Sequence, residues 1–174
     1  QSCFWSKDNK NRWFVTVNGV KKTGYFALSN ALKVFFENHP EKANFHYFSS
    51  ISFSEFKNIL QGGRNLMFLK QRWQNLKAVS RILVKKYKGN PEIFLKYCNG
   101  KCETFVKKVV RELPSFRDEP FYAGKKIFFW KRAQILAGDI FGALKNIHKQ
   151  SFNDVDWLSA FADYKVPQIL NSLG

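Results

Sequence analysis

The sequence predicts a mainly α protein, a multi-helix domain with a small β-hairpin near its N-terminus. Apolar residues recur three or four positions apart over most of the chain after residue 27, which is typical of helices with one buried face. Before residue 27, two short β-rich segments, RWFVTV and VKKTGYF, meet at Asn18-Gly19. This dipeptide accepts the positive φ angles of a two-residue hairpin turn, so we expect a hairpin over residues 12–26.

Prolines, a glycine and a capping box predict where the helices begin and end, in addition to the apolar spacing. Pro40 ends the first helix, Ser52 and Glu55 form a capping box, and Gly89 stops a long amphipathic helix. Pro91 and Pro114 open and close two of the later helices. In chain order the helices are expected near residues 27–38, 52–61, 66–88, 91 onward, 102–113, 125–147, 154–164 and 167–173.

The size and composition of the chain favour a single domain. A chain of 174 residues with 45% hydrophobic content can bury one substantial core. No apolar run approaches the roughly 20 residues of a membrane helix, and the first residues lack the pattern of a secretory signal. We therefore predict one domain over residues 1–174, in the cytoplasm or the nucleus.

Positive charge is concentrated in the first two thirds of the chain. Residues 1–117 hold 22 Lys and Arg against 7 Asp and Glu, whereas residues 118–174 hold 7 against 6. Such a surface attracts polyanions, and with 17% aromatic residues it could serve as a nucleic-acid platform. A solvated Lys-rich surface is the favoured interpretation, because no RNA-recognition, KH or helix-turn-helix signature accompanies the charge.

The cysteines and histidines do not form a metal-binding pattern. Cys98 and Cys102 lie four positions apart, but His39, His46 and His148 show no matching spacing, and a structural zinc site needs four ligands. We expect free thiols and no metal.

One acidic residue near the C-terminus stands out. Asp163 lies between Phe161 and Tyr164, shortly before Pro167. A carboxylate among aromatic rings is partly desolvated unless a cation or a hydrogen bond compensates it, so Asp163 is a candidate for chemistry on a planar or cationic group. Taken without further context, an Asp at this place in a short helix is more often a solvated or capping residue.

Three long segments carry a family resemblance. They are FWSKDNKNRWFVTVNGVKKTGYFALSNAL (4–32), LPSFRDEPFYAGKKIFFWKRAQIL (113–136) and FADYKVPQILNSLG (161–174). In order and wording they resemble the queuosine salvage proteins, the queuosine 5′-phosphate N-glycosylase/hydrolases. Chains of that family are considerably longer, so we expect this sequence to be an internal fragment of a longer one-domain chain.

The resemblance implies a fold, an activity and a site. The fold would be similar to the helical DNA glycosylases, and the activity would be release of queuine from queuosine 5′-monophosphate, with no metal or organic cofactor and no need to bind tRNA. Asp163 would be the catalytic carboxylate, and Phe161, Lys131 and Tyr164 would contact the substrate. The alternative is a basic, aromatic-rich tRNA-binding or interaction module without catalysis.

A second acidic residue of the late segments has a structural interpretation. Asp139 lies within the helix expected at 125–147, where a buried carboxylate would need a partner such as Arg132. A structural ion pair is therefore the expected role of Asp139.

Overall fold

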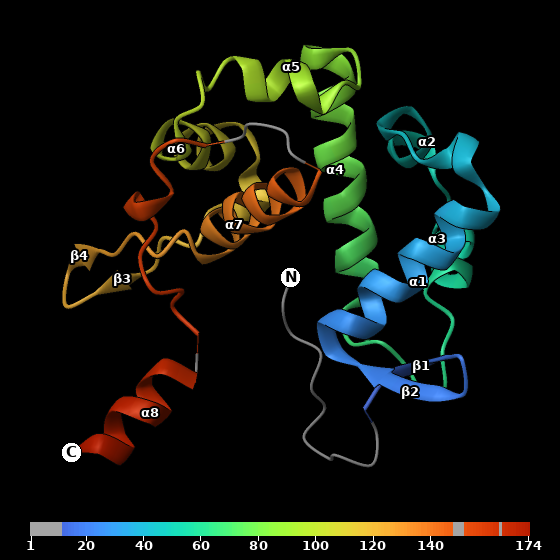
Figure 1. Cartoon of the computed structure of the whole chain (residues 1–174), viewed down its shortest axis with the longest axis horizontal. Helices are drawn as coiled ribbons and strands as arrows, with labels where there is room; N and C mark the ends of the chain where they lie inside the picture. Colours follow the sequence, from blue (N-terminus) through green and yellow to red (C-terminus); the bar gives the residue numbers. More distant parts are fainter. Residues whose placement is uncertain (1–11, 148–151, 164) are drawn as a thin grey trace. The chain divides into compact units, whose positions relative to one another are not determined.

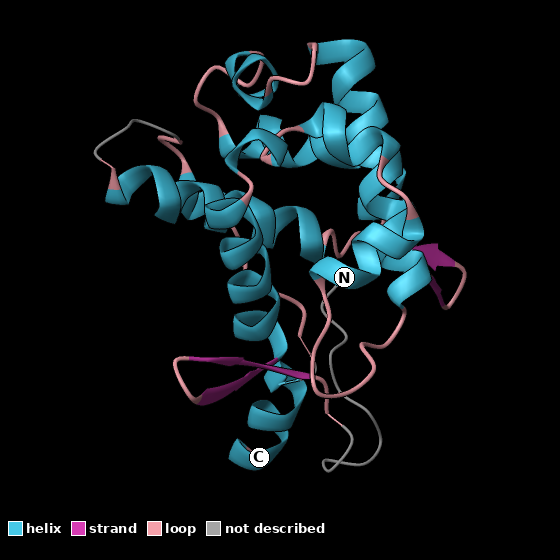
Figure 2. Cartoon of the chain, turned by 90° about the vertical axis from the view of Figure 1, so that its right-hand side faces the viewer, coloured by secondary structure: helices cyan, strands magenta, loops and turns pink. Residues whose placement is uncertain are grey.

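The chain is mainly helical. The structure, a computed structural model, describes residues 12–147, 152–163 and 165–174. These ranges hold eight α-helices, three 3-10 turns and two antiparallel hairpins (Figures 1 and 2). The α-helices make up more than half of the described residues, so the predicted fold class is confirmed. The chain forms two compact units, residues 1–90 and 91–174, and the prediction of a single domain stays a prediction.

The N-terminal hairpin forms where the sequence predicts it. Strand β1 (Phe14–Val17) pairs with β2 (Val20–Thr23) in antiparallel register. Asn18 and Gly19 form the turn with φ angles of 51° and 76°, which is the conformation that Asn-Gly tolerates best.

Three helices follow the hairpin in the first unit. Helix α1 (Gly24–Asn38) ends before Pro40, and α3 (Phe53–Ile59) begins with the predicted capping box. In that box the Ser52 Oγ accepts from the Glu55 N–H at 3.1 Å, and the Glu55 carboxylate accepts from the Ser52 N–H at 3.0 Å. Between them lies α2 (Phe45–Ser50), which the sequence analysis did not predict and which is capped by the side chain of Asn44.

The long helix α4 (Leu69–Tyr87) completes the first unit and packs along α2 (Figure 1). It ends at Lys88 and Gly89, both at positive φ, as the glycine predicted. The buried core of this unit consists of residues from the hairpin, the helices and the loop before α4: Trp13, Ala27, Phe48, Ile51, Phe56, Leu60 and Leu66.

The second unit is built around the packing of α6 against α7. It contains α5 (Pro91–Lys96), α6 (Cys102–Glu112), α7 (Lys131–Asn146) and α8 (Lys165–Leu173). Helix α6 buries one face: Cys102, Phe105, Val106, Val109 and Val110. Helix α7 contributes small buried residues, Ala133 and Ala137, which allow close approach of the two helices.

The prediction of a helix from 125 to 147 is wrong in its first six residues. Strand β3 (Phe121–Tyr122) pairs with β4 (Lys125–Lys126) through a turn at Ala123 and Gly124, whose φ angles are 48° and 74°. Strand is therefore not confined to residues 12–26. The helix starts only at Lys131, because Trp130 has a left-handed backbone with φ of 44°.

The predicted helix over residues 154–164 is also wrong. A single 3-10 turn, Val155–Trp157, stands in its place, and residues 158–163 are neither helix nor strand. Asp154 does not cap its own segment. Its carboxylate instead accepts the backbone N–H of Cys102 at 2.5 Å and of Glu103 at 3.5 Å, so Asp154 caps α6 from a distance in sequence.

No helix in the described part of the chain combines the length and the apolar character needed to cross a bilayer.

Candidate active site

Lys131 and Asp163 form an ion pair within the second unit. The Lys131 Nζ lies 3.3 Å from Oδ1 of Asp163, and the two side chains are 18% and 42% exposed. The lysine is thus mostly covered, whereas the carboxylate still presents a face to solvent. A pair this accessible contributes little to stability. It does hold a negative charge in a defined direction beside a mostly covered cation.

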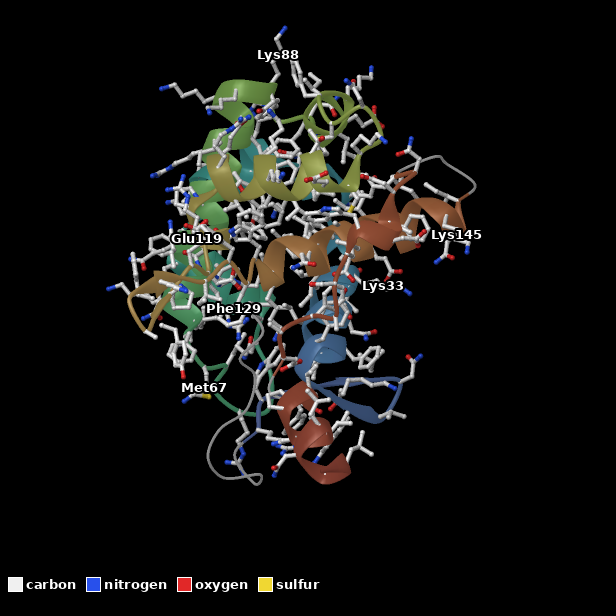
Figure 3. All side chains as sticks on the ribbon, turned by 90° about the vertical axis from the view of Figure 1, so that its left-hand side faces the viewer. Lys33, Met67, Lys88, Glu119, Phe129 and Lys145 are labelled. Atoms are coloured by element: carbon white, nitrogen blue, oxygen red, sulfur yellow. The ribbon has the colours of Figure 1, made fainter. Side chains whose placement is uncertain are left out.

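Two consecutive acids position Lys131 at the first residue of α7. Asp118 accepts the backbone N–H of Lys131 at 2.9 Å and thereby caps the helix. Glu119 accepts the indole N–H of Trp130 at 2.9 Å and also pairs with Lys126. The hydrogen bonds from Lys126 and Trp130 lower the pKa of Glu119, so this carboxylate stays ionised. The Phe129 N–H donates to the Asp118 carbonyl at 3.2 Å, which holds Phe129 beside these acids on the segment that leads into α7; Figure 3 labels Glu119 and Phe129.

Gln134, which the sequence analysis missed, connects α7 to the segment that carries Asp163. Its side chain is buried, and its Oε1 accepts from both the N–H and the Oγ of Ser159, at 3.0 and 3.1 Å. Its Nε2 donates to the carbonyl of Phe129 at 3.0 Å. The available signal was its spacing: Gln134 lies four residues after Trp130, on a helix face expected to be buried, and a buried amide must find partners.

Phe161 lies against the same helix. A Cβ added at Gly138 would sit 3.5 Å from Cζ of Phe161, so the ring rests over this glycine, and 37% of the residue stays exposed. Lys131, Gln134 and Gly138 are three and four positions apart and therefore share one face of α7. On that face Lys131 contacts Asp163, Gln134 contacts Ser159 and Gly138 lies beneath Phe161.

Two further residues were given roles in the sequence analysis, Tyr164 and Asp139. Tyr164 lies outside the described residues. Asp139 is exposed on α7, and its expected ion pair with a partner such as Arg132 stays a prediction.

Comparison with known proteins identifies the relatives of this chain. A family model described as "Queuosine salvage protein" matches residues 2–174. The chain belongs to the queuosine salvage protein family. The resemblance inferred from the three sequence segments is thereby confirmed.

Curated relatives of this queuosine salvage chain carry one name. A "Queuosine 5'-phosphate N-glycosylase/hydrolase" of Sphaerobacter thermophilus is 33% identical over 172 residues, which are 99% of this chain and 52% of the relative. The protein of that name from Mus musculus is 28% identical over 173 residues, 98% of this chain and 51% of the relative. One from Dictyostelium discoideum is 36% identical over 111 residues. The chain spans about half the length of the curated relatives it matches.

Exposed aromatic side chains surround the start of α7 in this queuosine salvage chain. Phe121, Tyr122, Phe128 and Phe129 are all exposed, and the Lys126 Nζ lies 5.4 Å from the centre of the Phe128 ring. The rings of Phe128 and Trp130 pack edge to face at 5.5 Å. Flat apolar surface is therefore available on the segment that precedes Lys131, as well as at Phe161.

The described residues hold no group of three or more His, Cys, Asp and Glu side chains suited to a metal ion. Cys98 and Cys102 are free and buried. Burial raises the pKa of both thiols, that of Cys102 to about 11 with a further contribution from Asp154, which makes them poor nucleophiles and poor metal ligands at neutral pH.

The first unit contains a cavity of about 420 Å³. Its walls are mostly apolar side chains of α1 to α4, with Asn44, Arg72 and Asn75 as polar groups, and it includes none of the predicted site residues.

Proposed function

We propose that the protein represented by this chain hydrolyses the N-glycosidic bond of queuosine 5′-monophosphate and releases queuine and ribose 5-phosphate. Membership of the queuosine salvage family and the shared name of its curated relatives support this substrate. The observation that carries the chemistry is the pair of Lys131 with a partly exposed Asp163.

The reaction requires a negative group beside the sugar. The bond between C1′ of the ribose and the ring nitrogen of the base breaks, and its electron pair leaves with the base. Positive charge therefore builds on the ribose in an oxocarbenium-like transition state. Water finally supplies a hydroxyl to C1′ and a proton to the base nitrogen.

Asp163 is the group proposed to meet that positive charge, either as an electrostatic stabiliser or as a nucleophile at C1′. Its exposed face leaves room for a sugar, and its other side is held by the ammonium of Lys131. A charged group fixed before the reaction starts stabilises developing charge without reorganisation. Lys131, as a donor, orients Asp163 or hydrogen-bonds the leaving base.

Phe161 is the proposed wall for the flat 7-deazaguanine base. Its ring is anchored on Gly138, is 37% exposed, and is two residues from Asp163. Offset stacking on such a ring orients a planar base. Tyr164 as a hydrogen-bonding group, the absence of a metal or organic cofactor, and a cytoplasmic or nuclear location stay predictions.

The test compares substrate forms with the full-length protein. We expect queuine release, followed by chromatography and mass spectrometry, to be much faster from queuosine 5′-monophosphate than from queuosine-containing tRNA. Equal or faster release from tRNA would contradict the proposed substrate. No release from any form, with tRNA affinity that falls steeply with salt, would favour the alternative of a tRNA-binding module.

A further inference from the structure

We propose that Gln134 is a positioning residue, which sets the place of Asp163 relative to Lys131 by holding the segment of Ser159 against α7. This inference rests on the proposed function, since it assigns Gln134 a role in the turnover that Asp163 carries out. Gln134 acts through the backbone that carries the two charged groups.

The backbone of α7 determines how far apart the two contacts lie. Lys131 and Gln134 are three residues apart on one helix face, so the helix backbone fixes their separation. Gln134 binds Ser159, and Lys131 meets Asp163. The distance between the two contacts on the helix is therefore constant, and the chain from Ser159 to Asp163 must span it.

The Gln134 amide bonds to two separate segments of the chain. A glutamine side chain offers one carbonyl oxygen with two acceptor positions and one NH₂ group. The oxygen is occupied by the N–H and Oγ of Ser159, and the NH₂ donates to the carbonyl of Phe129. One buried side chain thus ties together the segment that enters α7 and the segment that leads to Asp163.

The segment that carries Asp163 lacks regular secondary structure. Residues 158–163 form neither helix nor strand, so no ladder of backbone hydrogen bonds sets the position of Asp163. Local backbone hydrogen bonds, from the Asp163 N–H to the Phe161 carbonyl at 2.6 Å and from the Val166 N–H to the Asp163 carbonyl at 3.0 Å, shape the chain next to Asp163 but do not join it to α7. Because regular backbone structure does not fix this segment, the hydrogen bonds of the Gln134 side chain determine its position. A displacement of a catalytic group by about 1 Å can lower a rate by about a hundredfold.

The direct test is Gln134→Met in the full-length protein. Methionine has nearly the same length and fills the buried site without any of the three hydrogen bonds. We expect kcat to fall by about tenfold to a hundredfold, with KM changed less than threefold. Gln74→Met, an exposed glutamine on α4, is the matched control and should retain the turnover of the wild type.

Two further variants separate the contacts. Gln134→Glu keeps an acceptor for the Ser159 N–H and Oγ, but an ionised glutamate cannot donate to the Phe129 carbonyl. Because the contact with Ser159 is the one proposed to position Asp163, Gln134→Glu should retain more turnover than Gln134→Met. Ser159→Ala removes one of the two bonds to Oε1 and keeps the backbone N–H, and should lower kcat by less than Gln134→Met. If Gln134→Met does not fold, the turnover of Gln134→Glu and Ser159→Ala tests the inference in its place.

A double-mutant comparison distinguishes positioning from a merely structural role. If Gln134 acts through Asp163, adding Gln134→Met to Asp163→Asn should change the residual turnover by less than about threefold. The inference is overturned if Gln134→Met lowers turnover as much in the Asp163→Asn background as it does in the wild type. It is also overturned if the turnover of Gln134→Met alone stays within twofold of the wild type. If instead the wild type releases no queuine, the proposed function itself fails. If the wild type is active but Asp163→Asn has no effect on turnover, the proposed role of Asp163 fails, and with it the role of Gln134.

Discussion

Asp154 offers the sharpest test of how the segment before Asp163 is held. Its carboxylate accepts the N–H groups of Cys102 and Glu103 at the N-terminus of α6, and Cys102 is fully buried. In Asp154→Ala these donors lose their acceptor. Loss of a helix cap costs about 0.5–2 kcal/mol, and a buried donor left without a partner costs about 1–3 kcal/mol.

We therefore expect Asp154→Ala to lower the free energy of unfolding by about 2 kcal/mol. The measurement is urea denaturation of the full-length protein followed by circular dichroism, with the midpoint shifted and the slope unchanged. Asp156→Ala is the matched control, since Asp156 is exposed two residues away and should change stability by less than about 0.5 kcal/mol.

A second readout comes from the same variant. The Asp154 charge helps burial to raise the pKa of the Cys102 thiol, so its removal should bring that pKa down and speed labelling of Cys102 at pH 8. If Asp154→Ala and Asp156→Ala were equally stable, and Cys102 equally unreactive in both, the capping role derived from the contacts would be refuted.

Two other expectations follow from the second unit. The pKa of Cys102, about 11 against an ordinary 9.0, predicts labelling at pH 8 about a hundredfold slower than that of an exposed cysteine, as measured by peptide mapping. Because the folded-state pKa is the higher one, the stability contribution of this thiol is complete below pH 9 and is lost as the pH rises toward 11; stability that rises over that range would contradict it. Gly138→Ala places a methyl group at ordinary contact distance from Phe161 and replaces a helical glycine, so we expect about 1 kcal/mol of added stability with turnover kept. Gly142→Ala is the control for stability, because a Cβ at that position meets no atom within 4 Å. Loss of turnover in Gly138→Ala but not in Gly142→Ala would show that the Phe161 ring needs more room than the structure gives it.

Local signals in the sequence were sufficient for several elements. Asn18-Gly19 predicted the first hairpin, and Ser52 with Glu55 predicted a capping box that the structure confirms with both hydrogen bonds. Gly89 predicted the end of α4. Each of these signals acts within a few residues, so neighbouring sequence determines the outcome.

The errors occurred where distant contacts compete with local preference. Asp154 could cap its own segment by pattern, but the N-terminus of α6 takes its carboxylate instead, and the expected helix over 154–164 is reduced to a 3-10 turn. The turn at Ala123 was missed because alanine rarely adopts positive φ, although Gly124 beside it does so readily.

The candidate site was predictable in part. The resemblance to the family drew attention to Lys131, Phe161 and Asp163, and the structure brings Lys131 to Asp163. The clamp by Gln134 was not predictable from spacing, because its partners Phe129 and Ser159 come from two irregular segments whose paths the helical pattern does not determine.

The central claim is that Asp163 is the carboxylate that meets the positive charge on the ribose. Replacing it with Asn in the full-length protein keeps the shape and removes the charge. The measurement is steady-state release of queuine from queuosine 5′-monophosphate. We predict that kcat falls by about a hundredfold to a thousandfold, with folding and nucleotide affinity retained. An Asp163→Asn variant that folds, binds the nucleotide and turns it over within a few fold of the wild type would contradict the claim.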